Sequence, residues 1–253
     1  MNVHLYYLNH FNEWKIMQAL VNQDRIERSG RRNAAGAQRN HERTHAAILD
    51  ATIRTIARHS LSGTTVQRVA AEAGVSVGAV ILHYKSKEAL LVAALDLVAE
   101  DFEIARRKAL TEAGPDPVAA LGALIDVSLD PKVSDPDRVS VWSAFWGEAQ
   151  ARRVYLDRVG TLDNAYQNDL TRLVRQVIET GGYRHLDAEA VALGLAGLLD
   201  GQWQDIMVSG ETFDRQRARR MAQAYLAGLF PNEFTSAITS NATQAASERQ
   251  QQD

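Results

Sequence analysis

The sequence predicts an all-α protein with an N-terminal helix-turn-helix domain of three helices and a larger C-terminal helical domain. Every long segment after residue 86 has helical periodicity, and Pro or Gly residues separate these segments. No run alternates apolar and polar residues as a half-buried strand does. Residues 64–90, TTVQRVAAEAGVSVGAVILHYKSKEAL, have the form of two short helices joined by a glycine turn.

The first helix of the N-terminal domain is expected over residues 43–59. Its apolar positions Ile48, Leu49, Ile53 and Ile56 share one face with Thr52. It should end in the stretch HSLSGTT, where Gly63 permits a turn. Thr64 and Gln67 have the spacing of a capping box for the next helix.

The glycine turn has the spacing that a helix-turn-helix requires. Ala70 is small where the two helices cross, Gly74 can take a positive φ, and Val80 anchors the second helix. Ser76 stands at the N-cap position of that helix. An αα-hairpin without a partner is the alternative interpretation.

The C-terminal domain is expected to consist of six helices, bounded by Pro or Gly residues. Their predicted ranges are 86–110, 117–129, 138–150, 153–180, 187–208 and 214–230. The predicted domains are a disordered basic extension over 1–39, a DNA-binding domain over 40–88, a ligand-binding and dimerisation domain over 89–231, and a disordered tail over 232–253.

Composition excludes several classes of protein. The 253 residues include no Cys, so no disulfide or thiolate metal site is possible. Phosphate-binding loops, zinc motifs and a nucleophile elbow are absent, so neither a cofactor nor an enzymatic activity is expected. No membrane span or export signal is evident, which predicts a cytoplasmic location.

Charge is distributed unevenly along the chain. The net charge is −3, yet residues 25–87 hold eleven Arg or Lys against four acidic residues. This segment therefore carries +7 and the remainder −10. The asymmetry predicts that the front of the chain faces a polyanion. The basic run before Arg43 either lies along DNA or is a solvated tail.

The stretch TTVQRVAAEAGVSVGAVILHYKSKEALL resembles the DNA-binding domain of TetR-family repressors. The resemblance covers residues 43–100 by motif and continues to Pro231 by helix layout. It implies phosphate contacts and a helix that enters the major groove. The expected DNA-binding residues are Thr65, Arg68, Ser76, Val77, Gly78, Ala79, Ile81, Leu82, His83 and Lys87.

The expected reading helix departs from the family pattern. Val77 stands where the family often has Lys, and Ile81 where it often has a phosphate-stacking Tyr. The best base contacts left to this helix are thymine methyl groups. Partial packing of Ile81 and Leu82 toward the protein interior is the alternative.

The last two predicted helices are candidates for a dimer interface. Gly194, Gly197 and Gly201 interrupt the first of them, and glycine costs about 1 kcal/mol relative to alanine in a helix, which suggests close packing. TetR-like proteins dimerise through these helices, and two reading heads match a palindromic operator. A monomeric bundle is the alternative.

Aromatic residues gather in the C-terminal domain. The segments WSAFW and LDGQW resemble those of the choline-responsive, BetI-type repressors. The expected ligand-binding residues are Trp142, Phe145, Trp146, Tyr166, Trp203 and Met207, with an acid from Glu148, Asp200 or Asp205. A quaternary ammonium binds aromatic faces. Each of these aromatic residues is alternatively part of an ordinary core.

The resemblance implies a transcriptional repressor that binds double-stranded DNA as a homodimer and is released by a small-molecule inducer, choline-like in chemistry. The helix over 86–110 joins the two domains, so its displacement is the expected route from ligand to DNA. The alternative function is a helical ligand-binding or catalytic protein whose helix-turn-helix is only structural. A DNA-binding architectural protein without an inducer is a third interpretation.

Overall fold

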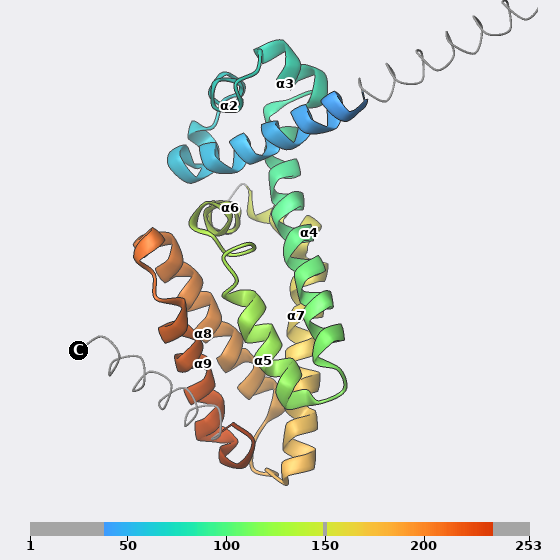
Figure 1. Cartoon of the computed structure of the whole chain (residues 1–253), viewed down its shortest axis with the longest axis vertical. Coiled ribbons are helices and arrows are strands. Elements are labelled where there is room, and N and C mark those ends of the chain that lie inside the picture. Colours follow the sequence, from blue (N-terminus) through green and yellow to red (C-terminus); the bar gives the residue numbers. More distant parts are fainter. Residues whose placement is uncertain (1–37, 149–150, 235–253) are drawn as a thin grey trace, which may run out of the picture. The chain divides into compact units, whose positions relative to one another are not determined.

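The computed structural model describes residues 38–148 and 151–234, and its regular elements are helices without any strand in these residues (Figure 1). The predicted all-α class is therefore confirmed. The chain divides after Ile48 into two compact units, and residues 38–48 are the described part of the first. The predicted disorder of residues 1–37 and 235–253 lies outside the described residues. Residues 38–39 and 232–234 are helical, so the predictions of disorder over 1–39 and 232–253 are wrong at these ends, where Phe234 is buried in the core.

The first described helix is longer than its periodicity predicts. Helical backbone covers residues 38–63, and the positive φ of 60° falls on Ser60 and not on Gly63. Thr64 explains the extension, because its backbone N–H and its hydroxyl both donate to the Ser60 carbonyl, at 3.2 and 2.7 Å. The predicted capping box on Thr64 is wrong, since that side chain is buried and turned toward the preceding helix.

The helix-turn-helix consists of α2 (Val66–Ala73) and α3 (Val77–His83). Thr65 caps α2 by accepting the backbone N–H of Arg68 at 3.2 Å, and Ser76 caps α3 by accepting that of Ala79 at 3.1 Å. Gly74 takes the left-handed conformation with a φ of 66°, and Val80 is fully buried. The predicted roles of Gly74, Ser76 and Val80 are confirmed.

Beyond α3, the described residues form six long helices, one short 3₁₀ turn and a helical segment over residues 231–234. The long helices and the turn are α4 (Lys87–Ala113), α5 (Pro117–Ser128), α6 (Pro136–Gly147), α7 (Arg152–Gly181), α8 (Ala188–Ser209), η1 (Gly210–Thr212) and α9 (Arg215–Leu229). Each of the six long helices begins and ends within three residues of its predicted range, whereas the 3₁₀ turn η1 was not predicted. The side chains of Ser86, Asp116, Asp135, Asp187 and Asp214 cap five of these helices. In the described part of the chain, no helix is both long and apolar enough to span a membrane.

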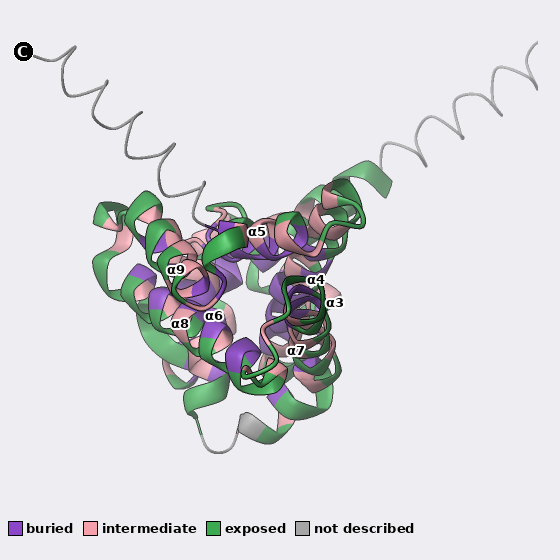
Figure 2. Ribbon diagram, turned by 90° about the horizontal axis from the view of Figure 1, so that it is seen from below, coloured by how far each residue is buried: buried purple, intermediate pink, exposed green. Residues whose placement is uncertain are grey.

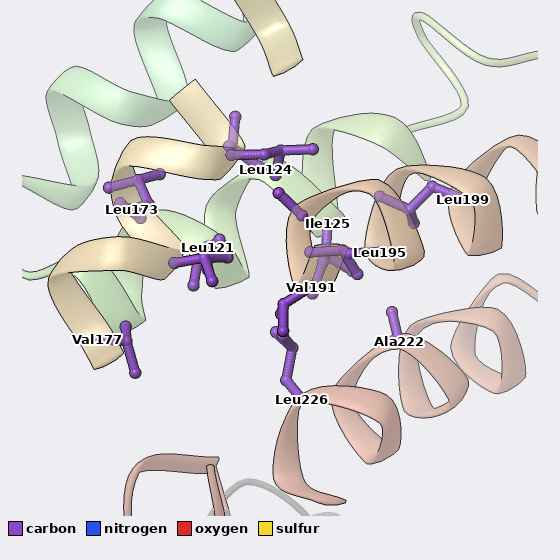
Figure 3. Packing of buried hydrophobic residues seen from close by; sticks show 14 of the residues in the cluster. Leu121, Leu124, Ile125, Leu173, Val177, Val191, Leu195, Leu199, Ala222 and Leu226 are labelled. Atoms are coloured by element: carbon purple, nitrogen blue, oxygen red, sulfur yellow. The ribbon is translucent and has the colours of Figure 1, made fainter. Parts of the chain in front are cut away.

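One apolar core joins four of these helices. Side chains of α5, α7, α8 and α9 point toward one another in Figure 3, where Leu121, Ile125, Leu195 and Leu226 are almost completely buried. Figure 2 shows the same arrangement from the end of the bundle, with buried faces turned inward and exposed faces outward. Burial of side chains of this size contributes about 1.5 to 3 kcal/mol each, so this core fixes the frame on which the remaining sites stand.

Arg215 ties the start of α9 to the loop before α6. Its guanidinium donates to the carbonyl of Leu129 at 2.7 Å and to the carbonyl of Ser134 at 2.8 Å. It also donates to the hydroxyl of Ser134 at 3.0 Å. Burial lowers the pKa of Arg215 from its usual value, yet the side chain stays charged because arginine titrates so far above neutral pH.

The three glycines of α8 have different environments. A Cβ added at Gly194 would lie 2.2 Å from the hydroxyl of Tyr225, so this glycine admits the Tyr225 ring of α9. At Gly197 and Gly201, no atom of the described residues lies within 4 Å of an added Cβ. Among the described residues, the prediction of close packing is therefore correct for Gly194 and not for Gly197 or Gly201.

We expect Gly194→Ala to destabilise the fold by about 1 to 3 kcal/mol. The new methyl group must displace the Tyr225 hydroxyl, which donates to the Val191 carbonyl at 3.1 Å, and this cost exceeds the roughly 1 kcal/mol that alanine contributes to a helix. Chemical denaturation measures the difference. Gly194→Ala combined with Tyr225→Phe should recover part of the loss, and equal loss in both backgrounds would contradict the clash.

Candidate functional site

The surface of α3 is apolar and exposed. Leu82 is 80% exposed, Ile81 54% and Val77 36%, whereas Val80 between them is fully buried. Gly78 is exposed and Ala79 and His83 are half-buried. The alternative of partial inward packing is therefore wrong for Leu82, whereas Ile81 is partly covered by the protein. A short helix that presents aliphatic side chains to solvent indicates a surface that contacts another molecule.

Four polar residues predicted to contact DNA already form hydrogen bonds with other residues of the protein. Thr65 and Ser76 cap helices, as described above. The Arg68 guanidinium donates to the carbonyl of Gly63, and the Lys87 amine donates to the carbonyl of Ser62 at 3.1 Å. These contacts hold the end of the first helix against both α2 and the start of α4. A direct phosphate contact by Arg68 or Lys87 would have to replace or share these bonds.

Two further cations of the basic segment form an internal ion pair. Glu72 accepts from Arg54 at 2.6 Å and from Arg58 at 2.9 Å, and the hydrogen bond from Arg54 lowers the pKa of Glu72. The positive charge of the front segment is thus partly used to join the first helix to α2. Lys85, just after α3, remains exposed.

A cavity of about 480 Å³ lies among α4, α5, α6, α7 and α8. Aromatic rings form much of its wall. The Phe102 ring lies 5.6 Å from the Trp203 ring and 5.7 Å from the Tyr166 ring, centroid to centroid. The Trp142 ring lies 5.9 Å from Trp203 and 6.0 Å from Tyr155. We call these five residues the aromatic cage.

The orientation of the cage is held by hydrogen bonds. The indole N–H of Trp203 donates to the carbonyl of Ser128 at 2.7 Å, and the hydroxyls of Ser128 and Tyr166 lie 3.2 Å apart. Tyr155 donates its hydroxyl proton to Asp163 at 2.7 Å. These bonds fix the rings of α7 and α8, so their faces are preorganised to receive a ligand.

Two carboxylates line the cavity without a basic partner. Asp163 accepts from Tyr155, whereas Asp200 has no hydrogen bond or ion pair within the described residues. Burial raises the pKa of both carboxyl groups, and the nearby charge of Asp163 raises that of Asp200 further. None of the described residues that line the cavity is Lys, Arg or His. A bound cation would therefore meet uncompensated negative charge.

The third acid of the cavity is neutralised by its surroundings. Glu103 of α4 accepts from the Arg106 guanidinium at 2.7 and 2.8 Å, and Arg107 donates to it as well. Arg106 also donates to Asp169 of α7. The hydrogen bond from Arg106 lowers the pKa of Glu103, so this carboxylate stays ionised and paired. Asp163 and Asp200 are left as the available charge.

The structure separates the predicted ligand-binding residues into two groups. Trp142, Trp146, Tyr166 and Trp203 line the cavity, whereas Phe145 and Met207 do not. Phe145 shares a helix face with Trp142, but its ring is buried in the core at 3% exposure. Of the three candidate acids, only Asp200 lines the cavity.

Three lining residues with the right chemistry are absent from the prediction. Phe102 of α4 and Tyr155 and Asp163 of α7 stand in long, mostly polar helices. The eight-residue separation of Tyr155 and Asp163, which places both on one helix face, is the signal that was available. The helical period does not show which face of a helix packs against the other helices, because this depends on the tertiary structure.

Family models match most of the described chain. A model described as BetI-type transcriptional repressor, C-terminal, matches residues 117–231, and one described as bacterial regulatory proteins, tetR family, matches residues 48–94. Among curated relatives, an HTH-type transcriptional regulator BetI of Paraburkholderia xenovorans is 31% identical over 185 residues, covering 72% of this chain and 90% of the relative. The corresponding regulator of Stenotrophomonas maltophilia is 28% identical over 181 residues, 71% of this chain and 89% of the relative.

Solved structures share the fold. A transcriptional regulator of Pseudomonas aeruginosa is 31% identical with a TM-score of 0.60, covering 76% of this chain and 92% of its own. A regulator of Saccharomonospora viridis in complex with choline is 24% identical with a TM-score of 0.57, covering 72% and 94%. FadR of Bacillus subtilis in complex with stearoyl-CoA is 19% identical with a TM-score of 0.57, covering 73% and 97%. The last two likenesses concern the fold alone.

Proposed function

The chain belongs to the TetR family of bacterial transcriptional regulators, with a BetI-type C-terminal domain, and on that premise we propose that it is a dimeric repressor whose inducer is a quaternary ammonium cation of the choline type. In this proposal, residues 40–88 bind a palindromic operator, and residues 89–231 dimerise and hold the inducer. The fold does not choose the ligand, because neighbours of this fold hold choline in one crystal and stearoyl-CoA in another. The side chains of the cavity must do so.

The aromatic cage with its two carboxylates that lack a basic partner is the observation that carries the proposal. A quaternary ammonium has no N–H to donate, so it is recognised by aromatic faces, each contributing about 0.5 to 2 kcal/mol when desolvated. Asp163 and Asp200 add the opposite charge. A fatty-acyl ligand would gain nothing from these carboxylates and would leave both desolvated.

The exposed faces of α8 and α9 support the proposed dimer. On α8, Leu193 is 54% exposed and Val208 81%, and the open glycines Gly197 and Gly201 lie between them. On α9, Met221 is 42% exposed. A glycine in a helix interior lowers the stability of the helix relative to alanine. Close packing of a second chain against Gly197 and Gly201 would account for their presence.

The helix α4 is the proposed connection between inducer and DNA. Its residue Phe102 belongs to the aromatic cage, and its first residue, Lys87, binds the carbonyl of Ser62 at the end of the first helix. An inducer that packs on Phe102 favours one position of α4. Couplings of this kind amount to about 1 to 3 kcal/mol, enough to change operator affinity about 5- to 150-fold.

A gel-shift experiment with genomic fragments, followed by ligand addition, tests the proposed function. The full-length protein should retard a fragment in a salt-sensitive manner, and choline should release it. The uncharged isostere 3,3-dimethylbutan-1-ol, which has the shape of choline without its charge, should not. Failure to retard any fragment would contradict DNA binding, and equal release by both compounds would contradict the cation.

We expect the affinity for choline to rise with pH. Burial raises the pKa of Asp163 and Asp200 in the ligand-free protein, so each is partly protonated at a pH where an ordinary aspartate is ionised. A bound cation favours the ionised carboxylates. Where the pH lies near or below the raised pKa values, choline binding must therefore release protons, and this weakens the affinity. Calorimetry in buffers of different ionisation heat measures this release. A pH-independent affinity without proton release would contradict the role of the two carboxylates.

A further inference from the structure

The exposed surface of α3 lacks the side chains that usually distinguish bases. Between Val77 and Leu82 every residue is Val, Gly, Ala, Ile or Leu, so no side chain there donates or accepts a hydrogen bond. The two most exposed are Ile81 and Leu82. In the major groove, guanine, adenine and cytosine present polar edges, whereas the thymine edge also carries the C5-methyl group. An aliphatic surface complements only the methyl group.

The neighbouring arginines do not readily replace this apolar recognition. Bidentate binding of guanine needs a free guanidinium, but that of Arg68 is bonded to the Gly63 carbonyl, and those of Arg54 and Arg58 are bonded to Glu72. The surrounding segment is nevertheless basic, with +7 over residues 25–87, which suits a phosphate backbone around an apolar reading surface. This charge favours a nucleic acid over a second protein as the occupant of the α3 surface.

We infer that α3 recognises its operator chiefly through the C5-methyl groups of thymines, which Ile81 and Leu82 contact in the major groove. This inference rests on the proposed function and specifies the partner: a duplex whose half-sites place thymines opposite α3. Each thymine methyl buried against these side chains should contribute about three- to fourfold in affinity, the size of one buried methylene group.

Replacement of thymine by deoxyuracil tests the inference, because it removes the methyl group and leaves base pairing and phosphates in place. A duplex selected by the full-length protein from random sequences is resynthesised with deoxyuracil at the half-site thymines. Affinity should fall by about tenfold for two contacted methyl groups, while the dependence on salt should stay the same.

The side chains are tested against the methyl groups in a double-mutant cycle. Leu82→Ala and Ile81→Ala should weaken binding of the thymine duplex and have a much smaller effect on the deoxyuracil duplex. Ile104→Ala is the matched control, because Ile104 is an aliphatic residue of α4 with 59% exposure outside the helix-turn-helix. It should leave both affinities unchanged.

The outcomes distinguish the inference from the function on which it rests. If the variants and the unaltered protein lose the same factor on deoxyuracil duplexes, the side chains do not contact the methyl groups and the inference is overturned. A variant that alters the oligomeric state and not DNA affinity would assign the α3 surface to protein contact, which also overturns it. If no duplex is selected at all, the proposed function itself fails.

Discussion

Gly197→Arg is expected to convert the protein to monomers and to weaken operator binding by about a hundredfold or more. Within the described chain, the position of an added Cβ at Gly197 is open, so the arginine has room in a single subunit. In the proposed dimer the same position faces the second copy. A charge buried there without a partner costs about 3 to 5 kcal/mol, and the two reading heads would no longer act together.

Sedimentation and gel shift measure the two effects on the same preparation. Gly122→Arg is the matched control, because Gly122 is also a helix-interior glycine, on α5, with no atom of the described residues within 4 Å of an added Cβ. It should remain dimeric and bind DNA. Both variants should keep their helical circular dichroism, and a dimeric Gly197→Arg variant would contradict the proposed interface.

Asp200→Asn is expected to weaken choline binding by about tenfold or more while stabilising the ligand-free protein at neutral pH. The substitution keeps the size of the side chain and removes a charge that no described residue neutralises. Asp200 is exposed, so solvent screens its attraction for a cation, and the expected tenfold change corresponds to about 1.4 kcal/mol.

The stability change has a definite sign. The folded protein raises the pKa of Asp200, so it holds the proton more tightly than the unfolded chain does. Stability is therefore lost as pH rises through the interval between the unfolded and the folded pKa, and asparagine avoids this loss. Without ligand, the thermal unfolding temperature of Asp200→Asn should exceed that of the unaltered protein at pH 8. At low pH the two temperatures should be equal.

Asp205→Asn provides the control for both measurements. Asp205 lies on the same helix and is exposed like Asp200, but it does not line the cavity. Its substitution should leave choline affinity and the thermal unfolding temperature unchanged. If Asp200→Asn binds choline as tightly as Asp205→Asn does, the carboxylate has no part in ligand recognition.

The sequence alone was sufficient for the elements of the fold because their determinants are local. Ser76, Asp187 and Asp214 each cap the helix that immediately follows, and Gly74 takes the one backbone conformation that its turn requires. The end of the first helix was mispredicted because the decisive bond joins Thr64 to the carbonyl of Ser60, and the motif Thr64–Gln67 competes with it in sequence.

The cavity was partly predictable for a different reason. Trp142, Trp146 and Trp203 are conspicuous in any sequence, and their segments resemble a known family of ligand domains. Phe145 also satisfies the helical period, but its neighbours belong to the core, and periodicity does not distinguish a ring facing core from a ring facing cavity. Asp163 was not predicted because its role depends on its proximity to Asp200 in the cavity, and Asp200 is distant in sequence and lies on another helix.

The aromatic cage has a practical consequence for spectroscopy. The chain contains four tryptophans, and Trp142, Trp146 and Trp203 all line the one cavity. Their near-ultraviolet emission originates where an inducer would sit, beside carboxylates whose ionisation changes the local field. The unlabelled protein should thus act as its own optical sensor, and its spectral response to a library of metabolites would rank ligands before any operator sequence is known.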